Sequence, residues 1–374
     1  MWSQVMTKLF RLVVLAMVLE LAIHESRLFE VVGDDSMVPC YFIFGDSLAD
    51  TGNNNVLQTT AKADYSPYGI DFPDGPTGRF SNGRTIPDII GELVGFKSFV
   101  PPFATANGTE IIYGVNYASG SAGILNETGE QLGQRIPMNM QLENHQTTIS
   151  SLVEIIGSEE LTSQYTSKCL YSVSIGSDDF INNYFMPEYY NTSEEYTLEE
   201  FSDILIENFT QQLVTLYSLG ARKIAVYGLG LLGCTPDAIN TYGTNGSTCY
   251  DSLNNASLIF NAKLLPVLKT LNAELPDATF IYIDAFATGV SSTSLALAVT
   301  DAPCCPVSGG QCIPNQSPCT NRSDYAFWDG FHPSEVLNIF SANLYFNDSN
   351  STYTYPYDIL SLVMLDQAAL VASI

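Results

Sequence analysis

The sequence predicts a three-layer α/β/α domain, in which helices cover both faces of a parallel β-sheet. Short apolar runs of strand length recur along the chain and alternate with longer segments of helical periodicity. Right-handed crossovers between parallel strands place helices on both faces of such a sheet. No long linker, repeat or low-complexity tract divides the chain, so we expect one domain over residues 36–374.

Five apolar runs are the strand candidates, and four longer segments are the helix candidates. The strands are expected at Tyr41–Phe44, Gly114–Ala118, Cys169–Ile175, Lys223–Tyr227 and Thr279–Ile283. The helices are expected at about Ile86–Val94, Met140–Ile156, Leu198–Leu219 and Leu253–Leu275. Together they predict a parallel five-stranded sheet.

Polar, glycine-rich turns follow the first three expected strands. Ser47 follows the first, the stretch 116–123 ends the second, and the stretch 176–179 follows the third. The carboxyl ends of parallel strands meet at one edge of a sheet, where open α/β folds place their ligands. A glycine-rich turn there can direct backbone N–H groups at a developing oxyanion. We therefore expect a site at this edge.

A serine hydroxyl needs an adjacent base before it can act as a nucleophile. The chain has three histidines, and His24 lies in a segment expected to be removed. His332 alone has an Asp nearby, Asp329, although an Asp-x-x-His pair in a turn could equally be a structural hydrogen bond. His145 lies in a stretch that resembles a polar helix face, so we predict that it is surface structure.

Composition excludes several classes of protein. With 46% hydrophobic residues over 374 positions, the chain can bury a large core. The 14 Lys and Arg against 40 Asp and Glu give a net charge of −26, which argues against nucleic acid as a partner. The sequence contains no metal-binding constellation and no nucleotide-binding loop, so we expect neither metal nor cofactor. It carries no signal for an oligomeric state.

The first residues have the pattern of a secretory signal peptide. Lys8 and Arg11 precede the apolar stretch 12–22, and we assign residues 1–30 to the signal, with cleavage between about Ala22 and Asp35. The stretch is too short for a membrane span and Glu20 interrupts it; a retained signal anchor is the rival interpretation. After cleavage we expect no stable membrane insertion.

Glycosylation sequons agree with secretion. The Asn-x-Ser/Thr candidates are Asn107, Asn126, Asn191, Asn208, Asn245, Asn255, Asn321, Asn347 and Asn350. A further sequon at Asn315 is doubtful because Pro318 follows its Ser317.

The eight cysteines are even in number, and four crowd into one loop at Cys304, Cys305, Cys312 and Cys319. Disulfides suit this pattern better than zinc, because no His or regular paired Cys-x-x-Cys accompanies them. Cys234 with Cys249 would close a short loop, and the cluster would hold the approach to Asp329 and His332. Spacing alone does not fix these pairings.

Six blocks of the sequence resemble plant GDSL esterase/lipases, in the order of that family and over essentially the whole mature chain. The blocks are Phe44–Leu48, Asp50–Asn55, Gly78–Gly83, Gly114–Ser119, Ile175–Tyr184 and Phe327–Pro333. The resemblance implies the SGNH-hydrolase fold with a flavodoxin-like sheet. It also implies ester hydrolysis or acyl transfer in the secretory pathway or cell wall. The serine does not lie in Gly-x-Ser-x-Gly, so an ordinary α/β-hydrolase is the less favoured fold.

Transferred block by block, the resemblance makes Ser47 the nucleophile, His332 the general base and Asp329 the residue that orients its imidazole. It implies an oxyanion hole made of the Ser47 N–H, a backbone N–H at Gly120, and the side chain at position 178. Ser121 is the alternative for the second donor.

The third block departs from the family, because Asp178 stands where the family has Asn. An ionised Asp donates no hydrogen bond and repels an oxyanion. Asp178 protonated by burial near Asp179 could still donate, with activity rising toward acidic pH. The alternatives are a slow enzyme, a binding or structural glycoprotein, or a neighbouring donor that replaces the Asn.

We therefore expect a secreted serine hydrolase, located in the cell wall or apoplast, that acts on carboxylic esters of lipids, acylated small molecules or cell-wall components. An acyltransferase using the same acyl-enzyme is the alternative, because nothing in the residues separates water from an alcohol as acceptor. Substrate choice is expected to depend on the loops Tyr65–Arg84 and Asp301–Asp324.

Overall fold

The computed structural model describes residues 36–372, and its centre is a five-stranded sheet in the order β1-β2-β3-β4-β9. The strands are β1 Tyr41–Gly45, β2 Leu170–Ser174, β3 Lys223–Tyr227, β4 Thr279–Ile283 and β9 Thr354–Tyr355. The first four are parallel, and β9 pairs antiparallel with β4. The mostly parallel sheet confirms the predicted α/β class.

One expected strand is wrong. The segment 114–118 lies beside β1, but it makes only an isolated bridge there, between Ile43 and Asn116. The Asn53 side-chain amide donates to the carbonyl oxygens of Asn116 and Ala118, at 2.9 and 2.8 Å, so these groups are already satisfied without a strand partner. The fifth strand is the short antiparallel β9, which has no strong apolar pattern in the sequence.

The four expected helices are present with ends that shift by no more than a few residues. The helices are α2 Ile86–Leu93, α3 Met138–Ile156, α4 Glu159–Thr166, α5 Ser177–Asp179, α6 Thr192–Glu195, α7 Leu198–Ser218, α8 Pro236–Tyr242, α9 Asp251–Glu274, α10 Ala285–Ser291, α11 Glu335–Phe346 and α12 Ile359–Ala372. Capping boxes at Thr85 and Thr197 satisfy free N–H groups and fix where α2 and α7 begin.

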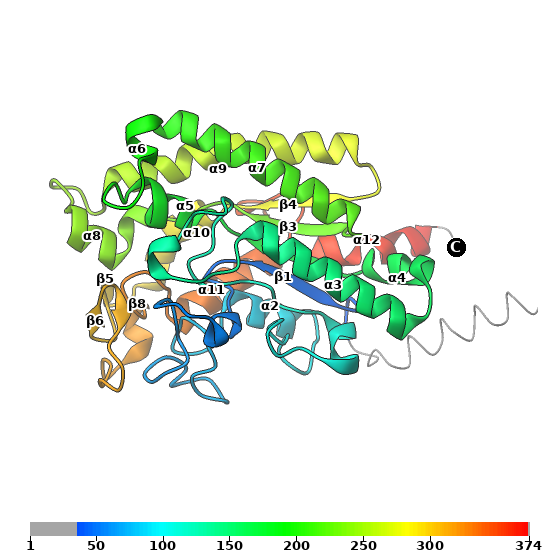
Figure 1. Cartoon of the computed structure of the whole chain (residues 1–374), viewed down its shortest axis with the longest axis horizontal. Coiled ribbons are helices and arrows are strands. Elements are labelled where there is room, and N and C mark those ends of the chain that lie inside the picture. The colour runs from blue at the N-terminus through cyan, green and yellow to red at the C-terminus, as the bar shows by residue number, and fades with distance from the viewer. Residues whose placement is uncertain (1–35, 373–374) are drawn as a thin grey trace, which may run out of the picture.

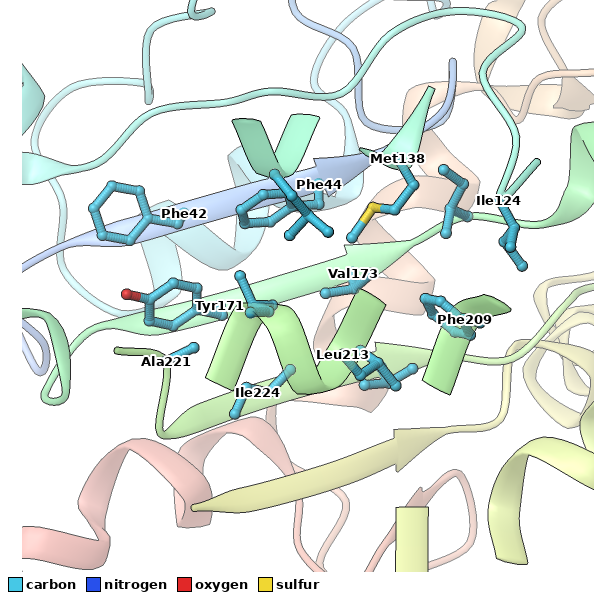
Figure 2. Packing of buried hydrophobic residues seen from close by; sticks show 14 of the residues in the cluster. Phe42, Phe44, Ile124, Met138, Tyr171, Val173, Phe209, Leu213, Ala221 and Ile224 are labelled. Atoms are coloured by element: carbon cyan, nitrogen blue, oxygen red, sulfur yellow. The ribbon is translucent and has the colours of Figure 1, made fainter. Parts of the chain in front are cut away.

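Helices cover the sheet on both faces (Figure 1). Alternate residues of the strands point to opposite faces, as a period of two requires. Phe42 and Phe44 of β1 pack with Tyr171 and Val173 of β2 in the larger core cluster, which includes buried side chains of α3, α7 and α9 (Figure 2). On the other face, Tyr41 and the strand residues that alternate with those of the larger cluster pack with side chains of α2, α11 and α12.

Four disulfides join all eight cysteines. They are Cys40–Cys169, Cys234–Cys249, Cys304–Cys319 and Cys305–Cys312. Cys234 and Cys249 pair as expected, and the cluster forms two bridges around the small strands β5 Val299–Pro303, β6 Val307–Ser308, β7 Gln311–Cys312 and β8 Tyr325–Phe327. β8 leads directly into the Asp329–His332 loop, so the bridges hold the chain beside the site.

The expected signal peptide lies outside the described residues. Within residues 36–372, no helix combines the length and the apolar character that crossing a bilayer requires.

Candidate active site

Ser47 lies two residues beyond β1, at the carboxyl edge of the sheet. A Cβ at Gly45 would lie 2.4 Å from the Ser174 carbonyl oxygen of the neighbouring strand, so only glycine fits where the chain leaves the sheet. The buried Gln141 of α3 binds Gly45 twice: its Oε1 accepts from the Gly45 N–H at 2.9 Å, and its Nε2 donates to the Gly45 carbonyl at 2.8 Å. Backbone and helix together fix the position of Ser47.

The Asp329–His332 loop is a tight turn that its own side chain closes. The Asp329 Oδ1 accepts from the N–H groups of Phe331 and His332, both at 2.8 Å. The Trp328 N–H donates to the His332 carbonyl at 2.8 Å, which closes the base of the turn. The spacing of three residues therefore serves the turn and the side-chain pair at once.

The three predicted residues Ser47, His332 and Asp329 meet in one chain of hydrogen bonds. The distance from Ser47 Oγ to His332 Nε2 is 2.7 Å, and His332 Nδ1 lies 2.7 Å from Asp329 Oδ2. Asp329 is completely buried and His332 is 6% exposed. The Tyr68 hydroxyl donates to Asp329 Oδ2 at 2.6 Å, so the carboxylate has partners on both oxygens. Such a chain can move the serine proton to the imidazole and hold the imidazole in one tautomer.

The second loop does not offer the donor that the resemblance implied. The Gly120 N–H donates to Asp50 Oδ2 at 3.0 Å, and Gly120 does not line the cavity beside Ser47. The next residue, Ser121, does line that cavity, has a positive φ of 63°, and makes no backbone N–H hydrogen bond to any described residue. Its buried hydroxyl also has no partner among the described residues.

The third loop brings Asp178 to the same cavity, with 7% of its surface exposed. Burial raises the pKa of Asp178 well above the usual value, and the nearby charge of Asp46 raises it further. One Asp178 oxygen, Oδ1, accepts a hydrogen bond from the Asn182 side-chain amide. Burial also raises the pKa of Asp46 to about 7, and its Oδ2 has no partner among the described residues.

Asp179 has a structural role next to Asp178. Its two oxygens accept from the N–H groups of Ile124 and Leu125 and from the Thr128 hydroxyl, at 2.7, 3.1 and 2.7 Å. These bonds join the third loop to the second. Burial raises the pKa of Asp179 to about 6 in spite of these donors.

The prediction that His145 is surface structure is wrong. His145 is completely buried on α3, and its ring packs between Phe42 and Phe44 of β1 and the rings of Tyr117 and Tyr171. Its Nδ1 lies 3.1 Å from the Tyr117 hydroxyl, and burial lowers the pKa of His145 to about 3. The polar neighbours of His145 in the sequence suggested an exposed helix face, but the buried stripe of α3 itself contains Gln141, His145 and Thr148.

A cavity of about 370 Å³ opens beside Ser47 and His332. Part of its wall is apolar, with Leu48, Leu132, Ile181 and Met186, and α8 forms another part. Phe80 and Gln311 come from the two loops that were expected to shape the pocket. Among the described residues, no group of His, Cys, Asp and Glu side chains is arranged to hold a metal ion.

Three supporting residues were not found from the sequence: Gln141, Asp50 and Tyr68. Asp50 lies in one of the six blocks that resemble the family. Its carboxylate accepts hydrogen bonds from the N–H groups of Gly52, Asn53 and Gly120 at 2.7, 2.8 and 3.0 Å. Burial raises the pKa of Asp50 to about 6. Each of the three acts through a contact distant in the sequence, which no local pattern indicates.

The Asn side chains of the nine sequons are all exposed, as a modified Asn has to be. The glycosylation candidates are therefore sterically compatible with the fold.

A Ser–His–Asp arrangement at the carboxyl edge of a mostly parallel sheet defines the class of serine hydrolases with an α/β/α fold. The family described as GDSL-like Lipase/Acylhydrolase matches residues 41–344. The chain belongs to this family of carboxylic ester hydrolases, and its fold is that of the GDSL/SGNH hydrolases.

Relatives in Arabidopsis thaliana support this membership. Three proteins named GDSL esterase/lipase are 47%, 46% and 44% identical to this chain. The matches cover 88%, 90% and 93% of this chain and 93%, 95% and 99% of the relatives. A solved structure of phospholipase A1 from Streptomyces albidoflavus NA297 aligns with a TM-score of 0.33 and 13% identity, over 82% of this chain and 98% of that one. That likeness is too weak to bear on the reaction.

Proposed function

We propose that the protein is a secreted esterase that forms an acyl-enzyme on Ser47, with His332 as the general base and Asp329 as the residue that orients it. The observation that carries the proposal is the distance of 2.7 Å between Ser47 Oγ and His332 Nε2, on a histidine whose other nitrogen is held by Asp329. Nucleophile, base and orienting group are the parts that acyl transfer to serine needs.

The proposed reaction uses this geometry in two stages, acylation of Ser47 and deacylation by water. His332 Nε2 takes the Ser47 proton while Oγ attacks the ester carbonyl carbon and forms a tetrahedral oxyanion. The imidazolium then gives that proton to the alcohol oxygen, the carbon–oxygen bond breaks, and the alcohol leaves. Water, deprotonated by the same nitrogen, attacks the acyl-enzyme and forms a second tetrahedral intermediate. The carbon–Oγ bond then breaks, the imidazolium returns the proton to Ser47 Oγ, and the carboxylic acid leaves.

For the oxyanion hole we propose the N–H groups of Ser47 and Ser121 and the side chain of Asp178. In the described residues neither N–H has a hydrogen-bond partner, whereas the Gly120 N–H is held by Asp50, so we propose Ser121 and not Gly120 as the second donor. The Asn182 amide occupies only Oδ1 of Asp178, which leaves Oδ2 to carry a proton. A protonated Asp178 would donate through that proton, as the Asn of the family would through its amide.

The raised pKa of Asp178 gives this proposal a direction in pH. Below that pKa the side chain is neutral and can donate to the oxyanion. Above it the side chain carries a negative charge, loses its donor and repels the oxyanion. Activity is therefore favoured on the acidic side of the Asp178 pKa and falls as pH rises through it.

Secretion to the cell wall or apoplast is part of the same proposal. It is supported by four disulfides, which persist in oxidising compartments, and by nine exposed sequons.

Labelling by a fluorophosphonate tests the proposed nucleophile. The secreted protein is treated across acidic and neutral pH, beside Ser47→Ala and the control Ser150→Ala, which alters an exposed serine of α3. We expect labelling of the wild type and of Ser150→Ala, and none of Ser47→Ala. If no labelling depends on Ser47 at any pH, the proposed esterase activity is wrong and a binding glycoprotein is favoured.

A further inference from the structure

The cavity beside Ser47 is acidic, and the wall contributed by the described residues contains no Lys or Arg. Asp46, Asp178, Asp237 and Glu188 line it, and His332 is the only basic side chain among the lining residues. Phosphate groups are bound in proteins by Arg, Lys or free helix N–H groups. With Asp178 protonated as proposed, Asp237 and Glu188 still give the wall a negative charge, which selects against an ester that carries a phosphate.

In the proposed reaction, the position of His332 determines where the alcohol half of an ester binds. Its Nε2 has to reach the leaving oxygen to protonate it, so the alcohol occupies the part of the cavity on the His332 side. Asp237, at the start of α8, is next to this loop, because its N–H donates to the Gly330 carbonyl at 2.9 Å. A Cβ at Gly330 would lie 3.2 Å from the Asp237 Cβ. Asp237 therefore belongs to the His332 side of the cavity.

The other groups near Asp237 suit the hydroxyls of an alcohol. Thr235 and Thr241 of the α8 region and Gln311 of β7 also line the cavity. Hydroxyl and amide side chains both donate and accept hydrogen bonds, as the hydroxyls of a polyol require. The carboxylates of Asp237 and Glu188 would also attract a cationic alcohol, which is therefore the competing substrate in the test below. Glu188 is exposed, so solvent screens its charge more than that of the half-buried Asp237.

We propose that the leaving alcohol of the substrate is an uncharged polyol, held through its hydroxyls by Asp237, and that esters of phosphate-bearing alcohols are rejected. This inference rests on the proposed esterase function and names the substrate class of the same site. Glycerol and sugars share this hydroxyl chemistry, and the experiment distinguishes between them.

Matched butyrate esters test the proposal, because the short acyl chain avoids micelles whose surface charge would confuse the comparison. Butyryl glycerol and butyryl glycerol phosphate differ by the phosphate alone; 6-O-butyryl glucose represents sugars, and butyrylcholine represents cationic alcohols. We expect kcat/KM for the better of the two uncharged polyol esters to exceed that for the phosphate ester by about 100-fold, since a carboxylate close to a phosphate repels it strongly. Comparable values for these two esters, or a preference for butyrylcholine, would overturn the proposal.

Asp237→Asn separates the local charge from the net charge of −26, which also repels anions. We expect the variant to reduce the discrimination against the phosphate ester about 10-fold. The control Glu154→Gln, which removes an exposed charge on α3 far along the chain from the cavity lining, should keep the wild-type ratio. Equal ratios in wild type and Asp237→Asn would contradict the role of Asp237.

Hydrolysis of p-nitrophenyl butyrate distinguishes a wrong substrate class from a wrong proposed function. If this activated ester is hydrolysed in a Ser47-dependent way and the polyol ester is not preferred over the phosphate ester, only the substrate class is wrong. If neither reaction occurs, the proposed function fails and this inference fails with it.

Discussion

The Tyr68 hydroxyl donates a hydrogen bond of 2.6 Å to Oδ2 of the buried Asp329. The same hydroxyl accepts the Cys312 N–H at 3.2 Å, and Cys312 is bonded to Cys305. Tyr68 therefore joins the disulfide-closed loop to the carboxylate that orients His332. It is a positioning residue, since it acts on the site through Asp329.

Replacing Tyr68 by Phe should lower kcat about 10-fold with a smaller change in KM, because one oxygen of Asp329 loses a charge-assisted donor and orients His332 less firmly. The matched control is Tyr65→Phe, which removes a neighbouring hydroxyl that donates to the Cys312 carbonyl at 2.9 Å. Steady-state kinetics on a soluble ester measure both. An equal loss in the two variants would indicate general damage to the loop and contradict the specific role of Tyr68.

Gln141→Leu should destabilise the protein by about 2 kcal/mol, because the buried Gly45 N–H and the part-buried Ile136 carbonyl lose their partner, and the Gly45 carbonyl keeps only the Ser119 N–H. Chemical unfolding measures the loss. Gln146→Leu, at an exposed position of the same helix, is the control and should change stability by no more than about 0.5 kcal/mol. If both variants unfold alike, Gln141 does not hold the end of β1.

His145 should make the protein lose stability in acid. Its pKa is lowered from 6.5 to about 3 in the fold, so the unfolded chain takes up the proton first. The contribution of His145 is complete above pH 6.5 and falls as pH drops toward about 3. The buried carboxyls with raised pKa values act in the opposite sense, because each gains stability as it becomes protonated.

A comparison of wild type with His145→Leu isolates this effect from the carboxyls. The difference in unfolding free energy between the two proteins should shift by about 1.4 kcal/mol for each pH unit below 6.5, against the wild type. Urea unfolding at several pH values provides the measurement. A difference that does not vary with pH would mean that His145 is not held neutral in the fold.

Much of the fold could be predicted because four strands and four long helices carry strong local patterns. Tyr41–Phe44 and Lys223–Tyr227, for example, are apolar runs that became buried strands. The segment 114–118 has the same apolar character, yet it pairs with β1 only through an isolated bridge, and the Asn53 amide takes the carbonyl oxygens of Asn116 and Ala118. Strand β9 has no such pattern and pairs only because the chain returns to the edge of β4.

The residues of the site also include some that could be predicted from the sequence and some that could not. Ser47, Asp329 and His332 were predictable because each belongs to a short motif whose chemistry is visible in its own residues. Gln141 and Tyr68 were not, because their partners lie 96 and 261 residues away in the chain. The Gly120 N–H was assigned by resemblance, but only the fold reveals that Asp50 already binds it. The prediction that His145 is exposed was wrong because burial depends on which face of α3 meets the sheet.

The central claim is that Asp178 supports the reaction in its protonated form. The most direct test is the dependence of kcat/KM on pH for wild type and Asp178→Asn with one soluble ester. We predict that wild-type activity falls as pH rises through the raised pKa of Asp178, whereas the Asn variant, which donates at every pH, keeps its activity there. Parallel profiles for the two proteins would contradict the claim.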